Sequence, residues 1–157
     1  MKLDSGKMVL IEERVPLRTH QLLRRELASG RKALYISKHS PSLLESQFDT
    51  VKENMQTRWL SPRPDGNCIP PMNLMRFEAD VQSFFEHNHD GIVVLNGVDV
   101  LEMWNGFRPV LEIMKRTRKR AGAQEGNFVI SLDPKDYYDG ELKALRMISD
   151  EVVLAPA

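Results

Sequence analysis

The chain has 157 residues, 41% of them apolar and 28% charged, which suits one globular domain with a two- or three-layer core. Its 22 basic and 22 acidic side chains leave no net charge, which argues against a surface built throughout for nucleic acid. A single cysteine, Cys68, excludes an intrachain disulfide and a multi-cysteine zinc site. No apolar run approaches the roughly 20 residues that span a bilayer, and the N-terminal MKLDSGK lacks a signal-peptide core. We therefore expect one cytoplasmic domain over residues 1–157, without membrane insertion.

The first half of the chain alternates short apolar runs with amphipathic stretches. Strands are predicted at residues 8–11, 33–37 and 57–61. A helix is predicted over residues 17–29, after Pro16 and before Gly30. Leu43, Leu44, Phe48 and Val51 then recur at helical spacing. Residues 62–71, PRPDGNCIPP, are predicted to form an irregular surface loop.

The second half repeats the alternation more regularly. Strands are predicted at residues 92–95, 127–132 and 152–154, and helices at 72–86, around 101–104, from 107 to Gly122 and around 142–148. Strands that alternate with helices through short connections indicate a mainly parallel sheet with helices on both faces. The expected fold class is therefore α/β, with three layers.

Four separated blocks of sequence carry a resemblance to a known family. They are VLIEERVPLRTHQLLRRELASGRKALYISKHSPSLL, CIPPMNLMRFEADVQSFF, GIVVLNGVDVLEMWNGF and FVISLDPKDYYDGELKAL. Together they resemble the mostly archaeal family called domain of unknown function 835. That family resembles a degenerate relative of RecA and KaiC-type ATPase domains, in which the phosphate loop is degenerate. Its members are often joined to sensor, histidine-kinase or receiver domains. The resemblance implies a RecA-like fold and a signalling or assembly module, and it implies no known activity.

The position after the first strand lacks the residues of a phosphate loop. Such a loop needs G-x-x-x-x-G-K-[ST], whose backbone N–H groups and lysine hold the phosphates. Residues 12–20 contain neither glycine nor lysine, and Glu12 and Glu13 bring negative charge instead. Arg18 and Thr19 stand where the lysine and the hydroxyl residue are expected. A weak phosphate contact and a solvated first helical turn both remain open for them.

A second set of polar residues follows the predicted strands. Asn96 ends the strand at 92–95, where an ATPase would carry a metal-binding acid, and Asn96-Gly97 is also typical of a turn. Asp99 and Asp133 are expected to act mainly as helix-cap or turn residues. Ser37 and His39 lie after the second strand, where parallel sheets place ligand crevices. The candidate crevice thus comprises Ser37, His39, Asn96, Asp99 and Asp133, but it lacks an identifiable group to orient His39 for acid–base chemistry. His87 and His89 are expected in an exposed turn.

Residues 115–120, KRTRKR, and the loop 62–71 are the predicted contact surfaces. The cations are Lys115, Arg116, Arg118, Lys119 and Arg120. No aromatic residue is interleaved with them, as a platform for single-stranded nucleic acid would require, so nucleic acid is possible but not favoured. The readings left open are a solvated helix end, a protein partner and another anion. Ile69 and Met72, at the end of the proline-rich loop, are the expected apolar contacts.

The residues therefore favour a non-catalytic interaction, signalling or assembly module, with a protein partner or self-association. We expect neither an enzyme nor a bound cofactor or metal, because no set of acid, base, nucleophile and metal ligand can be assembled. The alternative is an atypical nucleotide-binding or weakly hydrolytic domain.

Overall fold

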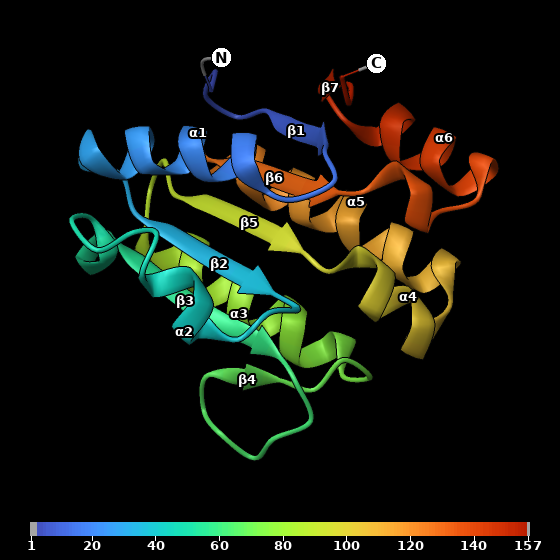
Figure 1. The fold of residues 1–157 in the computed structure, drawn as a ribbon, viewed down its shortest axis with the longest axis horizontal. Coiled ribbons are helices and arrows are strands. Elements are labelled where there is room, and N and C mark those ends of the chain that lie inside the picture. The colour runs from blue at the N-terminus through green and yellow to red at the C-terminus, as the bar shows by residue number, and fades with distance from the viewer. Residues whose placement is uncertain (1–2, 157) are drawn as a thin grey trace.

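Seven parallel strands form one sheet in the computed structural model, which describes residues 3–156 (Figure 1). The strands lie in the order β4-β3-β2-β5-β6-β1-β7. Every paired neighbour runs parallel. Their bounds are β1 Met8–Glu12, β2 Ala33–Ser37, β3 Met55–Leu60, β4 Cys68–Ile69, β5 Ile92–Asn96, β6 Asn127–Leu132 and β7 Glu151–Val153.

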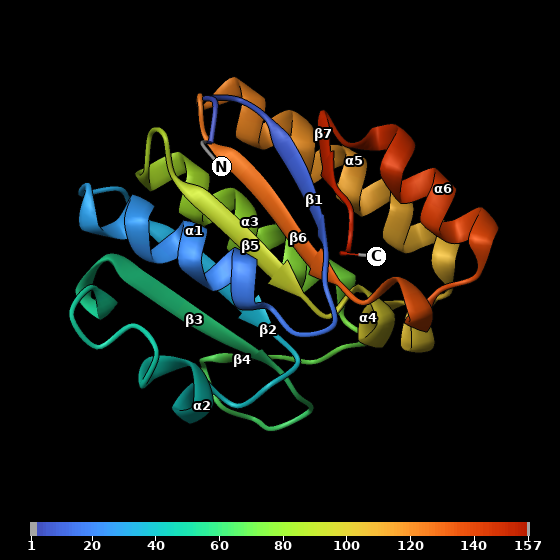
Figure 2. The ribbon, with the colours of Figure 1, turned by 45° about the horizontal axis from the view of Figure 1, so that its top comes forward.

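Helices cover both faces of the sheet and complete three layers (Figures 1 and 2). Helices α1 and α2 pack on one face, and α3, α4, α5 and α6 pack on the other. Their bounds are α1 Leu17–Ala28, α2 Pro41–Glu45, α3 Leu74–His87, α4 Val98–Asn105, α5 Phe107–Ala123 and α6 Asp139–Ile148. Within residues 3–156, no helix combines the length and the apolar character needed to cross a bilayer. The expected α/β class with a mainly parallel sheet is confirmed.

The central strands are apolar at successive positions because both of their faces are buried. In β1, Met8 and Leu10 point into the core beneath α3, α5 and α6, while Val9 and Ile11 point into the core beneath α1. This alternation continues past the last apolar residue. Glu12 therefore faces α6, and Glu13 faces the start of α1, as their hydrogen bonds show. The register of β1 thus decides where each of the two carboxylates goes.

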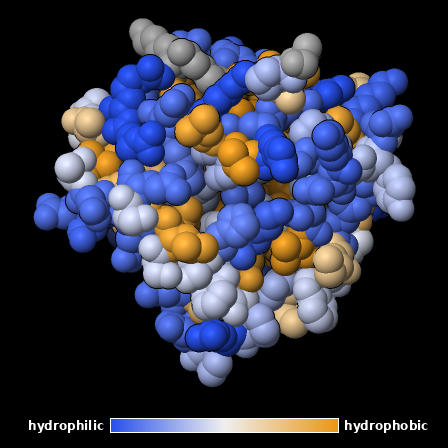
Figure 3. All heavy atoms as spheres, in the orientation of Figure 1, coloured by the Kyte–Doolittle hydropathy of each residue, from blue (hydrophilic) through white to orange (hydrophobic). Residues whose placement is uncertain are grey.

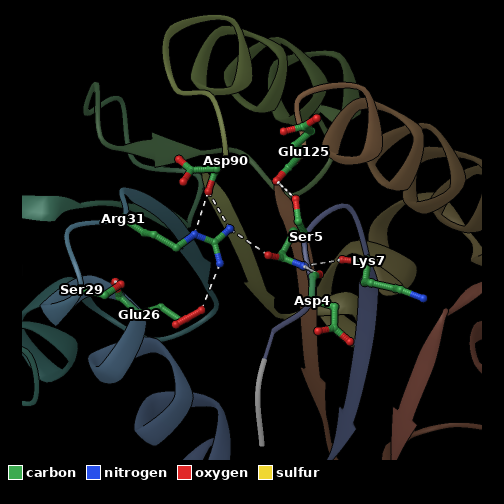
Figure 4. A network of polar contacts seen from close by, with 9 residues as sticks. Asp4, Ser5, Lys7, Glu26, Ser29, Arg31, Asp90 and Glu125 are labelled. Carbon is green, nitrogen blue, oxygen red and sulfur yellow. Dashed lines mark hydrogen bonds and ion pairs between the residues drawn. The ribbon is translucent and has the colours of Figure 1, made fainter.

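Polar contacts fasten the edge of the sheet where the strands begin (Figure 4). The Arg31 guanidinium donates to the Asp90 carbonyl oxygen at 2.6 and 2.9 Å, to Asn127 Oδ1 at 2.8 Å and to Glu26 Oε1 at 3.1 Å. Asn127 in turn donates to the carbonyl oxygens of Asp4 and Lys7. One planar cation thus links the end of α1, the turn before β5 and the start of β6. The polar groups at this edge thus hold the fold together, and the candidate site lies at the opposite edge, where the strands end.

Two local predictions were wrong. The apolar spacing from Leu44 to Val51 does not form one helix, since α2 ends at Glu45. The chain continues through turns with i to i−3 hydrogen bonds, such as Phe48 N to Glu45 O at 3.1 Å, so helical spacing can be met by successive turns. The loop 62–71 is not irregular throughout, because Cys68 and Ile69 form β4 against β3.

Candidate functional site

A pocket of about 250 Å³ lies at the edge where the strands end. Its walls come from the β1–α1 loop and from the residues that follow β2, β5 and β6. The chain leaves β1 and β2 toward one face of the sheet, and it leaves the adjacent strands β6 and β5 toward the other (Figure 1). Such switch points are where open parallel sheets bind ligands. The pocket therefore occupies the position expected of a ligand site.

The carboxylate of Glu13 fills the N-terminal end of α1. Its Oε1 accepts the backbone N–H of Arg18 at 2.8 Å, and its Oε2 accepts the Thr19 backbone N–H at 3.4 Å and the Thr19 hydroxyl at 2.5 Å. The Ser131 hydroxyl also donates to Oε2, at 2.8 Å. Only 6% of Glu13 is exposed. Free N–H groups and the helix dipole make this position attractive to anions, and here the anion belongs to the chain itself.

The residues at the phosphate-loop position, Arg18 and Thr19, make hydrogen bonds within the chain. The N–H groups of Arg18 and Thr19 already have an acceptor, and so does the Thr19 hydroxyl. The Arg18 side chain turns away, because its Nη1 donates to the carbonyl oxygen of Leu154 at 3.1 Å. Pro16, the N-cap residue, makes no side-chain cap. Glu13 therefore acts as the missing cap from outside the helix.

Glu12 is held separately from this site. Its carboxylate accepts two hydrogen bonds from the Arg146 guanidinium of α6, at 2.6 and 2.7 Å. Glu12 is 2% exposed, and the hydrogen bond with Glu12 raises the pKa of Arg146. A bidentate pair of this kind satisfies a buried carboxylate that would otherwise be costly. Sequence reasoning grouped the two glutamates as one source of repulsion, whereas each has its own partner.

The structure brings together four of the five residues of the predicted crevice. His39, Asn96, Asp99 and Asp133 all line the pocket. Ser37 does not, because it is fully buried and its hydroxyl accepts the backbone N–H of His39 at 2.9 Å. That bond uses the main chain of His39, so it does not connect the imidazole to a hydroxyl nucleophile.

The two aspartates have different roles. Asp133 caps the turn Pro134–Asp136 by accepting the Lys135 N–H at 3.0 Å, as expected. Asp99 is not the cap of α4, which was the expectation. Gly97 is the N-cap, with φ of 153°, and Asp99 lies in the first turn, where it pairs with Lys38 at 2.9 Å. The positive φ of Gly97 favours glycine at this turn.

A set of polar contacts that reaches from the surface into the core through His20 and Tyr35 was not predicted from the sequence. The His20 ring lies 2.6 Å from the Tyr35 hydroxyl and 2.5 Å from Gln47 Oε1. Burial lowers the pKa of His20 and raises the pKa of Tyr35, whose hydroxyl also bonds Asn96. The signal was the helical spacing of His20 with Leu23 and Leu27, which puts His20 on the buried face of α1.

Within residues 3–156, no three or more His, Cys, Asp or Glu side chains are placed to bind one metal ion. Cys68 is buried in β4 and forms no disulfide. The exposed His87 and His89 lie at the end of α3 and in the turn after it, as expected.

The basic residues at the end of α5 are largely paired within the chain. Arg116 and Arg120 meet Glu78 of α3, at 2.8 and 3.7 Å. Arg118 meets Asp150 at 2.5 Å. Lys115 meets Glu112 at 3.2 Å, while Lys119 has no such ion pair among the described residues. Lys115, Arg118 and Lys119 also line an open groove of about 550 Å³.

The prediction that Ile69 is an exposed contact residue was wrong. Ile69 is fully buried in β4, where it packs in the main core and offers no surface to a partner. Met72 remains 46% exposed. The Asn105 side chain of α4 donates to the Pro71 carbonyl oxygen at 2.8 Å, which fixes the end of the loop against α4.

A family model described as "Protein of unknown function (DUF835)" matches residues 16–148. The chain belongs to this family. No curated protein matches the chain. The fold is similar to that of the flagellar accessory protein FlaH from Methanocaldococcus jannaschii, with a TM-score of 0.69, 14% identity and coverage of 96% of this chain and 71% of that one.

A KaiC-like protein from Pyrococcus horikoshii OT3 gives a TM-score of 0.67 at 12% identity, covering 96% of this chain and 73% of its own. At these identities the comparisons show the fold alone. This member of the family therefore has a RecA-like three-layer α/β/α fold.

Proposed function

We propose that this chain is a non-catalytic interaction module in which Glu13 occupies the position that phosphate takes in an ATPase of this fold. The observation that carries the proposal is the set of hydrogen bonds from α1 and Ser131 to the Glu13 carboxylate. A buried carboxylate at this point stabilises the helix start without a nucleotide. The domain then folds with its anion position already satisfied.

The rest of the pocket supports the same proposal. At about 250 Å³, it is smaller than the roughly 300–1,000 Å³ of common small-molecule sites. Four acids, Glu13, Asp99, Asp133 and Asp136, line it against two basic residues, Arg14 and Lys38, and Lys38 is already paired with Asp99. Negative walls disfavour a triphosphate electrostatically. Asn96 offers an amide where magnesium would favour a carboxylate.

The proposal also accounts for the intact three-layer fold. The sheet, both helical layers and the network around Arg31 form a rigid support. A rigid support of this kind can present surfaces to a partner without chemistry of its own. We therefore place the function in surfaces and not in the crevice.

Thermal unfolding with ATP, GTP and cyclic nucleotides, with and without magnesium, tests this proposal. A ligand that binds the folded state alone adds roughly 2.7 kcal/mol at 100 times its dissociation constant. We expect no change in the unfolding temperature of the wild-type chain with any of these ligands. A magnesium-dependent rise, with or without release of phosphate from ATP, would support the alternative of an atypical nucleotide-binding or weakly hydrolytic domain and overturn the proposal.

A further inference from the structure

A second groove lies beside the pocket, between α4, the segment after β6 and the start of α6. It is open, with a volume of about 570 Å³. Its lining consists of four acids, two tyrosines, one methionine and one lysine: Asp99, Glu102, Asp136, Glu141, Tyr137, Tyr138, Met103 and Lys135. Asp99, Asp136 and Tyr137 line both the pocket and this groove, but the β1–α1 loop and Glu13 do not line the groove, so it lies outside the filled anion position.

Two of the lining carboxyl groups, those of Glu102 of α4 and Glu141 of α6, interact with each other. Burial, a hydrogen bond with Glu141 and the charges of Glu141 and Asp99 raise the pKa of Glu102 to about 7. Two carboxylates cannot hydrogen-bond each other unless one holds a proton. Below about pH 7, Glu102 is therefore protonated and can donate to Glu141. A guanidinium or ammonium group could replace that proton and satisfy both oxygens at once.

The remaining charges of the groove leave it negative. Lys38 neutralises Asp99 from the side of the pocket, at 2.9 Å. Asp136 is exposed, and Lys135 is the one cation in the lining. Burial and the charge of Asp99 raise the pKa of Tyr137, so its hydroxyl stays neutral. A groove of this composition attracts a cation and repels a phosphate.

Exposed apolar side chains border the same carboxyl groups. Met103 and Tyr138, which line the groove, are 79% and 81% exposed. Elsewhere, on the face seen in Figure 3, hydrophobic residues are scattered in small groups among hydrophilic ones. Methionine and aromatic side chains are enriched in protein interfaces. Acid and apolar surface together suit a ligand that is both basic and apolar.

We propose that this groove docks a basic amphipathic segment of another protein. One arginine or lysine of the segment lies between Glu102 and Glu141, and the apolar face of the segment packs on Met103 and Tyr138. The proposal rests on the proposed function, because it names the class of partner that an interaction module of this shape binds.

A second copy of the chain fits the groove less well. The dense basic run of this chain is at the end of α5, where Arg116, Arg118 and Arg120 already pair with Glu78 and Asp150. Docking these residues into another copy would first break those ion pairs. A segment from a different protein carries no such cost.

Fluorescence anisotropy with two labelled peptides tests the groove directly. One peptide has a helical repeat of arginine, leucine and alanine, and the other has glutamate in place of each arginine. We expect the full chain to bind the arginine peptide and not the glutamate peptide. The double variant Glu102→Gln/Glu141→Gln should weaken binding by about tenfold or more, because both charged acceptors are lost.

The matched control is Glu53→Gln/Glu86→Gln. It makes the same two substitutions at exposed residues near the opposite edge of the sheet, and it should change affinity by less than about twofold. Met103→Ala/Tyr138→Ala alters exposed side chains only and should also weaken binding. Binding to the wild-type chain should tighten from about pH 6 to about pH 8, because the entering cation displaces a proton.

Three outcomes would overturn the inference. They are equal binding of both peptides, equal affinity of the groove variant and its control, and self-association of the wild-type chain in sedimentation that the groove variant abolishes. Equal binding includes the case in which neither peptide binds. Each of these outcomes overturns the groove proposal alone, whereas nucleotide binding in the thermal experiment overturns the proposed function. Thermal unfolding of each variant confirms that it is folded.

Discussion

Glu13 is the residue on which the account of this protein depends most. A carboxylate placed within reach of two N–H groups of a helix start and two hydroxyls has almost every lone pair in use. A mobile anion could make the same contacts, but it would have to be bound from solution. The covalently attached anion has no such requirement, so the helix start is satisfied at any nucleotide concentration.

Removing the carboxylate should therefore destabilise the fold. Glu13→Ala leaves the N–H groups of Arg18 and Thr19 without their acceptor, and we expect the free energy of unfolding to fall by about 2–3 kcal/mol. Denaturation with urea measures the loss. Glu86→Ala is the control, because Glu86 is exposed and, within residues 3–156, accepts a hydrogen bond from Gln82 alone; it should change stability by less than about 0.5 kcal/mol. Equal losses in the two variants would mean that Glu13 is not a cap.

At the scale of elements, Glu102 of α4 and Glu141 of α6 couple the two helices electrostatically. In the folded protein the pKa of Glu102 is about 7, above its ordinary value of 4.5. Between these values the folded state keeps a proton that the unfolded chain releases. Stability from this group is therefore present at low pH and is lost as the pH rises through about 7.

The variant Glu102→Gln should remove this pH dependence, since the amide keeps a donor toward Glu141 at every pH. We expect the variant to unfold at least about 2 °C above the wild-type chain at about pH 8, with no gain at about pH 5. The lowered pKa of His20 acts in both proteins and cancels in the comparison. Thermal unfolding followed by circular dichroism measures both temperatures. A constant difference across this range would show that Glu102 does not donate a proton to Glu141.

At the scale of the whole molecule, the sequence was sufficient for the class of fold and for every described strand except β4, which lies in the predicted loop. β2 and β6 have the predicted bounds, and the other central strands differ by a residue or two. Buried parallel strands are readable because their apolar runs are continuous and separated by amphipathic helices. The turns between Leu44 and Val51 could not be predicted in this way, because their apolar residues have the spacing of a helix.

The candidate site was predictable only in part. Parallel strands bring the residues at their carboxyl ends to one edge, which is why His39, Asn96, Asp99 and Asp133 met as expected. The partners of Glu12 and Glu13 were not predictable, because they depend on which way each side chain of β1 points and on residues more than 100 positions away. The pairing of Glu102 with Glu141 joins two elements for the same reason.

The central claim is that the N-terminal end of α1 is occupied by Glu13 and is closed to phosphate. Backbone amide resonances of Arg18 and Thr19, followed by nuclear magnetic resonance during a titration with magnesium-ATP, test it most directly. We predict that both resonances stay fixed during the titration of the wild-type chain. In the Glu13→Gln variant, whose acceptor is weaker, we predict that both resonances move as magnesium-ATP is added. Saturable movement of both resonances in the wild-type chain would contradict the claim, because it would place the nucleotide where Glu13 lies.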